Sequence, residues 1–205
     1  MRSSLARIGR ALGDVTAVVL THAHPDHIGA AERLRADRGI PVRLLGTEAP
    51  HARGQIIEEA SKLQVLRAAW RPTVLLWVLR IMRAGATRVE RLTEVKPFEA
   101  RSGPLDVPGH LVPVPTPGHT SGHCAFHLPE RGVLIAGDAL ITAHPAARNT
   151  GPQLCPPMFN HDEAAAVASL QVLAGLPADV VLPGHGPAYR GSPASAVERA
   201  LAAHR

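Results

Sequence analysis

The chain has 205 residues, of which 45% are hydrophobic and 19% are charged, a balance typical of folded globular proteins and not of disordered ones. It contains no apolar run of membrane-spanning length, no signal-peptide core and only two cysteines, so we expect a cytoplasmic protein without a membrane span. The net charge is +5, and the basic residues, nearly all arginines, are spread along the chain without a basic block, which argues against a nucleic-acid partner.

The first half of the chain alternates helical patterns with buried strands. We predict a helix near 3–12, a strand at 15–20, a helix at 28–37 and a strand at 42–45. Residues 49–92 are predicted to form a helical insert with helices at about 50–69 and 72–85, because Pro72 disfavours helix at Arg71. The stretch 73–82 is apolar nearly all round, so it either forms a lid over a substrate or packs on the body.

From residue 95 onward, short strands separated by glycine and proline replace the long helices. The expected strands are 95–99, 104–107, 111–116, 123–128, 132–136 and 180–182. A loop at 139–160 precedes a helix that is capped by Asn160 or Asp162, and a last helix begins at Ser192. Without an internal repeat or linker, residues 1–205 are expected to form a single domain.

Metal-ligand residue types are concentrated between a predicted strand and the following helix. His22, His24, Asp26 and His27 occupy this short segment. Imidazoles two residues apart in an extended loop can point to one place, and a turn started by Pro25 directs the next two side chains to a second place nearby. Imidazole and carboxylate are the donors that zinc takes when no thiolate is used. The segment therefore predicts a metal site.

Three other predicted strands end in a ligand-type residue beside glycine. His119 follows one strand, Asp138 ends another, and His185 follows a third. Glycine next to such a residue permits a close approach of the backbone and unusual φ angles. We expect these strand ends to converge on the same rim as the segment 22–27.

Together these motifs resemble those of the metallo-β-lactamase-fold hydrolases of the glyoxalase II and lactonase type. The matching stretches, in the family's order, are THAHPDH (21–27), TPGHTSGH (116–123), GD (137–138) and PGHG (183–186). The resemblance implies an α/β fold, an αββα sandwich. It also implies two metal sites, the first held by His22, His24 and His119, the second by Asp26, His27 and His185, with Asp138 bridging both.

The resemblance further implies a metal-dependent hydrolase that attacks an ester, thioester, lactone or similar bond with a metal-bound hydroxide. Two Zn²⁺ ions are expected, with iron or manganese as alternatives. Asp26 is the candidate catalytic residue, because it would orient the water or handle its proton. The substrate is a small molecule, and the stretch 73–82 leaves open that it carries an apolar group.

Other functions remain as alternatives. Relatives with the same motifs include a mononuclear-iron persulfide dioxygenase, whereas a nuclease would need a basic surface that this sequence does not offer. Only 21 residues precede His22, fewer than is usual in the family, so we expect a shortened first sheet with an exposed edge. A homodimer would cover that edge; an inactive, truncated family member is the other interpretation.

The remaining histidines and both cysteines are expected to be structural. His123 is predicted to support the site without acting as a ligand, and Cys124 to be a small core residue. Cys155 lies in a proline-rich loop that could border a pocket, but we expect a structural role for it. Ordinary surface or capping positions are expected for the remaining six histidines, although His144 and His161 flank a loop near the predicted rim. These six are His51, His110, His127, His144, His161 and His204.

Overall fold

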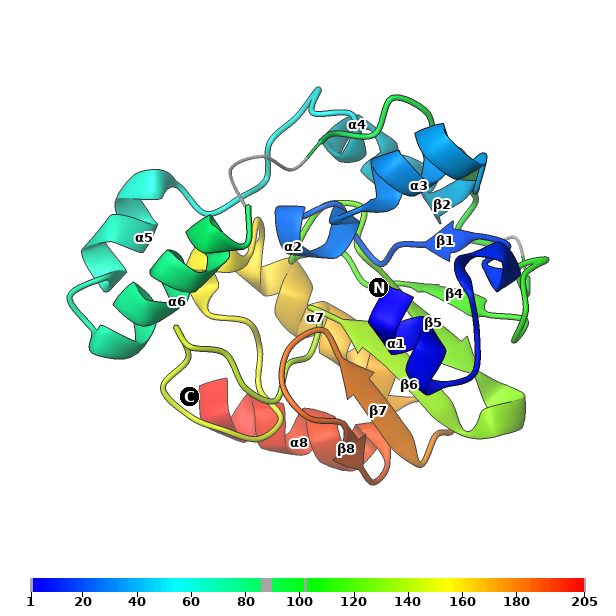
Figure 1. Cartoon of the computed structure of the whole chain (residues 1–205). Coiled ribbons are helices and arrows are strands. Elements are labelled where there is room, and N and C mark those ends of the chain that lie inside the picture. The colour runs from blue at the N-terminus through cyan, green and yellow to red at the C-terminus, as the bar shows by residue number, and fades with distance from the viewer. Residues whose placement is uncertain (1, 86–89, 102, 205) are drawn as a thin grey trace.

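A computed structural model describes residues 2–85, 90–101 and 103–204 of the chain. Two β-sheets pack face to face, and helices cover the outer face of each (Figure 1), which confirms the predicted αββα architecture. The helices are α1 (Arg2–Arg7), α2 (Pro25–Ile28), α3 (Ala31–Arg38), α4 (Ala49–Ala52), α5 (Lys62–Ala68), α6 (Pro72–Arg83), α7 (Glu163–Ala174) and α8 (Pro193–His204). The strands are β1 (Val18–Val19), β2 (Val42–Leu45), β3 (Lys96–Phe98), β4 (Val112–Pro115), β5 (Cys124–Leu128), β6 (Val133–Gly137), β7 (Val180–Pro183) and β8 (Tyr189–Arg190).

The first sheet has the order β1-β2-β3, with all strands parallel. Parallel neighbours need a crossover, and α2 and α3 supply it between β1 and β2. Side chains alternate along β2, so that Val42 and Leu44 pack beneath the helices while Leu45 faces the second sheet.

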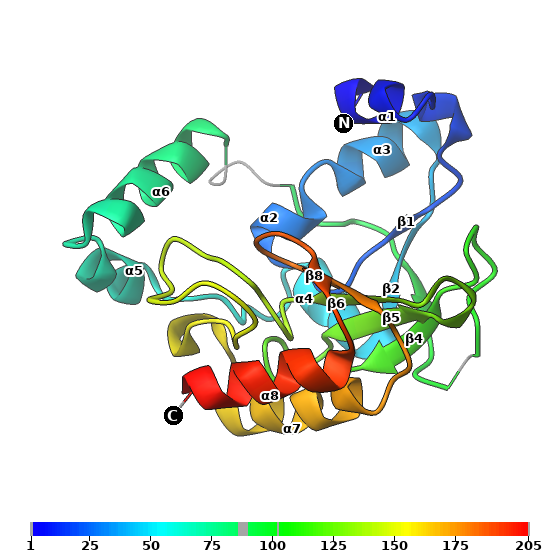
Figure 2. The same cartoon turned by 90° about the horizontal axis from the view of Figure 1, so that it is seen from below.

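The second sheet has the order β4-β5-β6-β7-β8 and is antiparallel except for the pair β6 and β7. Helix α7 provides the crossover between these two parallel strands. Helices α7 and α8 lie side by side on the outer face of this sheet (Figure 2). Leu170 and Leu173 of α7 and Val197 of α8 are buried there.

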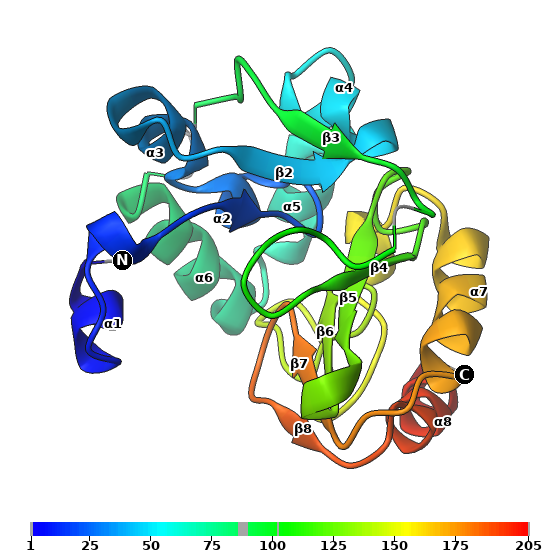
Figure 3. The same ribbon diagram turned by 90° about the vertical axis from the view of Figure 1, so that its right-hand side faces the viewer.

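Two phenylalanines lie among the apolar side chains between the sheets. The rings of Phe98 on β3 and Phe126 on β5 meet with centroids 5.9 Å apart. Along β5, Cys124 and Phe126 point to this layer, whereas Ala125 points to the helices. Cys124 is therefore the small core residue that the sequence predicted. Figure 3 shows the two sheets with α3 and α4 outside one and α7 and α8 outside the other.

Some predicted elements were wrong. The single helix expected at 50–69 is two helices, because Gly54 has a φ of 72° and the chain is not helical again until Ser61 caps α5. Residues 104–107 form bends instead of a strand, and the short strand β8 was not predicted. Part of the expected insert, residues 86–89, lies outside the described residues. Among the described helices, none is both long enough and apolar enough to cross a membrane.

Candidate metal centre

Four segments of the chain meet at one edge of the sandwich, and they bring the seven predicted ligand residues together. Strands β6 and β7 are parallel, so Asp138 and His185, which follow them, emerge at the same edge. The carboxylate of Asp138 lies at the centre of the cluster. Its oxygens are 3.9 Å from His22 Nε2, 3.5 Å from His27 Nε2, 3.3 Å from His119 Nε2 and 3.2 Å from His185 Nε2.

The first group consists of three buried histidines, His22, His24 and His119, whose ring nitrogens could hold a metal ion. His24 Nε2 donates to the carbonyl of Glu58 over 2.7 Å, so its Nδ1 faces the group. His119 Nδ1 donates over 3.1 Å to Oδ1 of Asn160, whose amide nitrogen is held by two other acceptors. These outer bonds fix both tautomers, as they do around metal ligands.

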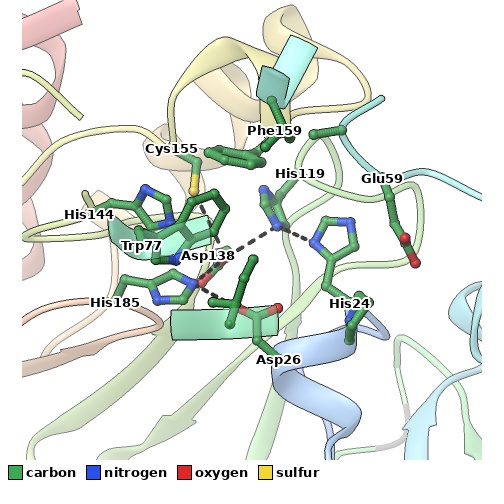
Figure 4. A pocket seen from close by; sticks show the side chains of 14 residues that line it. His24, Asp26, Glu59, Trp77, His119, Asp138, His144, Cys155, Phe159 and His185 are labelled. Carbon is green, nitrogen blue, oxygen red and sulfur yellow. Dashed lines mark hydrogen bonds and ion pairs between the residues drawn. The ribbon is translucent and has the colours of Figure 1, made fainter. Parts of the chain in front are cut away.

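The two inward nitrogens of this group are only 2.9 Å apart (Figure 4). Burial lowers the pKa of His24, and it lowers the pKa of His119 to about 3, so both rings are neutral near pH 7. His24 Nδ1 and His119 Nε2 therefore carry lone pairs that point at each other. Such an arrangement is repulsive without a cation, and it fits a metal ion bound by both nitrogens.

The second group, Asp26, His27 and His185, lies closer to solvent. His185 Nε2 is 3.2 Å from Asp26 Oδ2, and His27 Nε2 is 3.7 Å from the same oxygen. Burial lowers the pKa of His185, but Asp138 and Asp26 outweigh it and raise that pKa to about 10. Burial raises the pKa of Asp26, but the bond from His185 outweighs it and lowers that pKa to about 2. Protons on the histidine rings balance the negative charge of these carboxylates, and a bound cation would compete with those protons.

Buried polar atoms without a hydrogen bond also gather at the cluster. His22 Nε2, His27 Nε2 and Asp138 Oδ1 are such atoms among the described residues. Most buried polar atoms in proteins have a partner, so three without one at a single place require an explanation. A metal ion that accepts nitrogen and oxygen ligands would provide it.

A pocket opens beside the cluster, and its space of about 780 Å³ includes part of the open solvent at its mouth. Its polar floor includes Asp26, Asp138 and His185. The apolar wall of the pocket consists of Val65 of α5, Trp77 and Ile81 of α6, and Phe159. Figure 4 shows the rings of Trp77 and Phe159 close to His144. One face of the stretch 73–82 thus lines the pocket.

The Metallo-beta-lactamase superfamily model matches residues 1–185. The chain belongs to this superfamily. Among curated relatives, the probable metallo-hydrolase YflN of Bacillus subtilis (strain 168) is 28% identical over 83% of this chain and 64% of its own length. A hydroxyacylglutathione hydrolase of Cereibacter sphaeroides (strain ATCC 17029 / ATH 2.4.9) is 27% identical over 80% of this chain and 46% of its own length. The chain thus spans less than two thirds of either relative.

Solved structures of the superfamily share the fold. The family protein TTHA1429 from Thermus thermophilus is 30% identical with a TM-score of 0.67, covering 99% of this chain and 64% of that one. TTHA1623, solved in a di-iron-bound form, is 27% identical with a TM-score of 0.58, and the match covers 92% of this chain and 77% of that one. The chain is therefore a hydrolase-like superfamily member with a histidine and aspartate cluster suited to metal binding.

Glu48, which the sequence analysis missed, connects two of the loops that carry the predicted metal ligands of this superfamily member. Its fully buried carboxylate accepts bonds from Ala23 N–H at 2.8 Å, Thr120 Oγ1 at 2.8 Å and Gly122 N–H at 3.1 Å. It also lies 3.0 Å from Nδ1 of His51. The sequence offered one indication of this role, which is the position of Glu48 just after the strand 42–45.

Three histidines expected at ordinary surface or capping positions lie elsewhere. His51 is fully buried beside Glu48, so that prediction was wrong. His127 is buried within β5 and donates to the carbonyl of Pro177 over 2.7 Å. His144 lines the pocket, where its ring meets those of Trp77, Phe159 and His185 at centroid distances of 5.1 Å.

His123 and Cys155 lie directly behind and beside the central carboxylate. His123 Nε2 accepts the backbone N–H of Asp138 over 3.1 Å, which agrees with its predicted supporting role. That approach needs Gly137, which has a φ of 54° and where a Cβ atom would lie 2.6 Å from His123 Nε2. Cys155, expected to be structural, lines the pocket instead, with Sγ 3.9 Å from Asp138 Oδ2.

Proposed function

We propose that this protein is a metal-dependent hydrolase that cleaves a thioester or another activated ester, lactones included. The observation that carries the proposal is the position of two ring nitrogens, His24 Nδ1 and His119 Nε2. They lie 2.9 Å apart beside an open pocket, and their lone pairs point at each other. The similarity to hydroxyacylglutathione hydrolases supports a thioester as the first substrate class to test.

Two ions, with zinc as our choice, would be held by the seven clustered residues. His22, His24 and His119 would hold one ion, Asp26, His27 and His185 the other, and Asp138 would lie between them. When bound, such ions supply Lewis-acid chemistry, because they lower the pKa of a water molecule and polarise a substrate carbonyl.

The two carboxylates have different tasks in this proposal. The side chain of Asp26 is 54% exposed, whereas that of Asp138 is 4% exposed. Both carboxylates line the pocket, but Asp26 is far more accessible to a substrate and a water molecule. We assign it the orientation of the attacking water and the transfer of its proton, whereas Asp138 holds the centre together.

His144 supplies a hydrogen-bond donor to the pocket. Its Nδ1 accepts the backbone N–H of Ala146 over 3.0 Å, which leaves the proton of the neutral ring on Nε2. Burial lowers its pKa to about 4, and the charge of His185 adds to this effect, so the ring stays neutral near pH 7. We assign His144 the stabilisation of the charge that develops on the substrate oxygen or on the leaving sulfur.

The apolar wall selects the substrate group that lies opposite the cluster. Val65, Trp77, Ile81 and Phe159 offer aliphatic and aromatic surface without a charge, so we propose a small-molecule substrate with an apolar acyl group. In this proposal, residues 1–205 form one domain, and the insert 49–92 contributes most of this wall.

The test combines metal analysis with hydrolysis of a panel of acyl thioesters, esters and lactones. Protein purified without chelator should contain between one and two zinc ions per chain, and His119→Ala should lose metal and hydrolysis together. His127→Gln is the matched control, because His127 is also a buried histidine but bonds to a backbone carbonyl away from the cluster. Protein that hydrolyses the panel equally well with and without a chelator would refute the proposal.

Iron is the second candidate, favoured by the di-iron-bound form of TTHA1623. Imidazole and carboxylate ligands suit iron as well as zinc. In that case the chain would resemble a persulfide dioxygenase, which uses iron. Iron content after expression with both metals, followed by oxygen uptake on a persulfide, would decide between the two activities.

A further inference from the structure

The excess of positive charge in this protein lies in one short segment. Residues 60–85 contain five basic residues and no acidic residue. The rest of the chain holds the remaining 17 basic and all 17 acidic residues, so its formal charge is zero. This segment, which includes α5 and α6, therefore carries the whole net charge of +5.

The same segment exposes an unusual amount of apolar surface. Helix α6 is apolar on two opposite faces, since Val74, Trp77 and Ile81 recur at helical spacing and turn toward the body. The opposite face of α6, the helix α5 and the turn between the two helices expose large side chains to solvent, and we call these the outer patch. Its members are Leu66, Trp70, Leu75, Leu76, Leu79 and Met82.

Arginines accompany the outer patch. Arg67 on α5 and Arg80 and Arg83 on α6 are exposed, whereas Arg71 donates to the carbonyls of Ala146 and Ala147 and fixes the helix pair to the body. Figure 1 and Figure 2 both show α5 and α6 side by side at one margin of the molecule, where a flat surface can reach them.

We propose that the outer patch docks on the surface of an anionic lipid bilayer. Leucines and an exposed tryptophan flanked by arginines, without an acidic residue, are the composition of helices that lie in a membrane interface. With 12 residues, α6 is about 18 Å long, so it would lie on the bilayer and not cross it.

The charge of the segment favours an anionic bilayer over a second copy of the chain or a nucleic acid as the partner of the outer patch. A two-fold contact between two copies would place the patch against itself, so that arginines would face arginines with no acidic partner in the segment. A nucleic acid would pair with the arginines but would leave the leucines without an apolar partner. An anionic bilayer matches both the charge and the apolar side chains.

The two tryptophans of the chain, Trp70 and Trp77, both lie in this segment, so fluorescence reports on it directly. In a Trp77→Phe background, Trp70, which is 81% exposed, is the sole probe. We expect a blue shift with phosphatidylcholine vesicles that contain phosphatidylglycerol, and none with pure phosphatidylcholine. Flotation of the full chain with the same two vesicle types should give the same ranking, and high salt should weaken binding.

Paired variants separate the two contributions to binding. Leu76→Ser with Leu79→Ser should lower the partition coefficient about tenfold or more, and so should Arg80→Glu with Arg83→Glu. Val172→Ser is the apolar control, because Val172 is 51% exposed on α7. Arg33→Glu with Arg38→Glu is the charge control, since both arginines are exposed on α3. Both controls should bind like the parent.

Three results would overturn the proposal. The first is equal binding, or no binding, to both vesicle types. The second is a dimer in solution that shields Trp70 from a soluble quencher without lipid. The third is tighter binding to an oligonucleotide than to the anionic vesicles. None of these measurements depends on hydrolysis, so the proposal stands or fails separately from the proposed function.

Discussion

The substitution Glu48→Gln should destabilise the protein, although it only replaces one carboxylate oxygen by an NH₂ group. The carboxylate receives two donors on each oxygen, Ala23 N–H and His51 on one, Thr120 and Gly122 N–H on the other. A glutamine keeps one acceptor oxygen and places an NH₂ group against the other pair of donors. Each buried donor left without a partner costs roughly 1–3 kcal/mol, so we expect a loss of about 4 kcal/mol.

For a chain of this size that loss corresponds to a decrease in Tm of about 8–16 °C. Thermal unfolding followed by circular dichroism measures it, and Glu198→Gln, at an exposed position on α8, is the control expected to melt like the parent. Metal affinity should fall roughly 10- to 100-fold as well, because Glu48 holds the loops of His24 and His119. A Glu48→Gln variant that melts within about 3 °C of the parent would show that this carboxylate does not hold the loops together.

Three further predictions follow from the site. Gly184→Ala should abolish metal binding, because its Cβ would lie 1.7 Å from Asp138 Oδ1, whereas Gly13→Ala, with nothing within 4 Å, should bind metal normally in the same titration. With a chelator present, the stability that His185 contributes should be fully present below pH 6.5 and be lost as the pH rises toward its folded-state pKa of about 10. Urea midpoints at pH 6 and pH 9 test this, and a midpoint that rises with pH in the parent but not in His185→Gln would contradict it. His144→Phe should lower kcat roughly 100-fold with little change in KM, while His144→Gln, which keeps an N–H donor, should recover part of the rate.

The fold was largely predictable because its strands have a clear pattern. The glycine and proline residues that separate the short strands correctly placed β5 within 123–128, and Pro72 correctly marked the start of α6. The helix expected at 50–69 is interrupted at Gly54, and a contact from outside the segment also keeps the chain near Glu58 out of a helix. The carbonyl of Glu58 accepts a bond from His24, 34 residues away, and such a tertiary contact replaces the helical bond. Local propensity carries no information about it.

The central residues of the site were predictable because they follow strands and lie in short motifs. Asp138 and His185 follow neighbouring parallel strands, so topology alone brings them together. Glu48 and His51 lie outside any motif, and the partners of Glu48 are 25 and 74 residues distant in Ala23 and Gly122. Their burial depends on which loops meet above β2, and that is a property of the assembled sandwich.

Helix α6 joins the two proposals, because its two apolar faces would serve different ligands. A helix that only covers a pocket needs one apolar face and normally exposes a polar one. Trp77 and Ile81 line the pocket, whereas Leu76 and Leu79 face outward. If both proposals hold, an acyl substrate dissolved in a bilayer would lie close to the pocket when the outer patch is docked. Leu76→Ser with Leu79→Ser should then reduce the rate on a vesicle-embedded thioester relative to the rate on a short, dissolved one. An equal reduction of both rates would show that the outer leucines serve the fold and not the delivery of substrate.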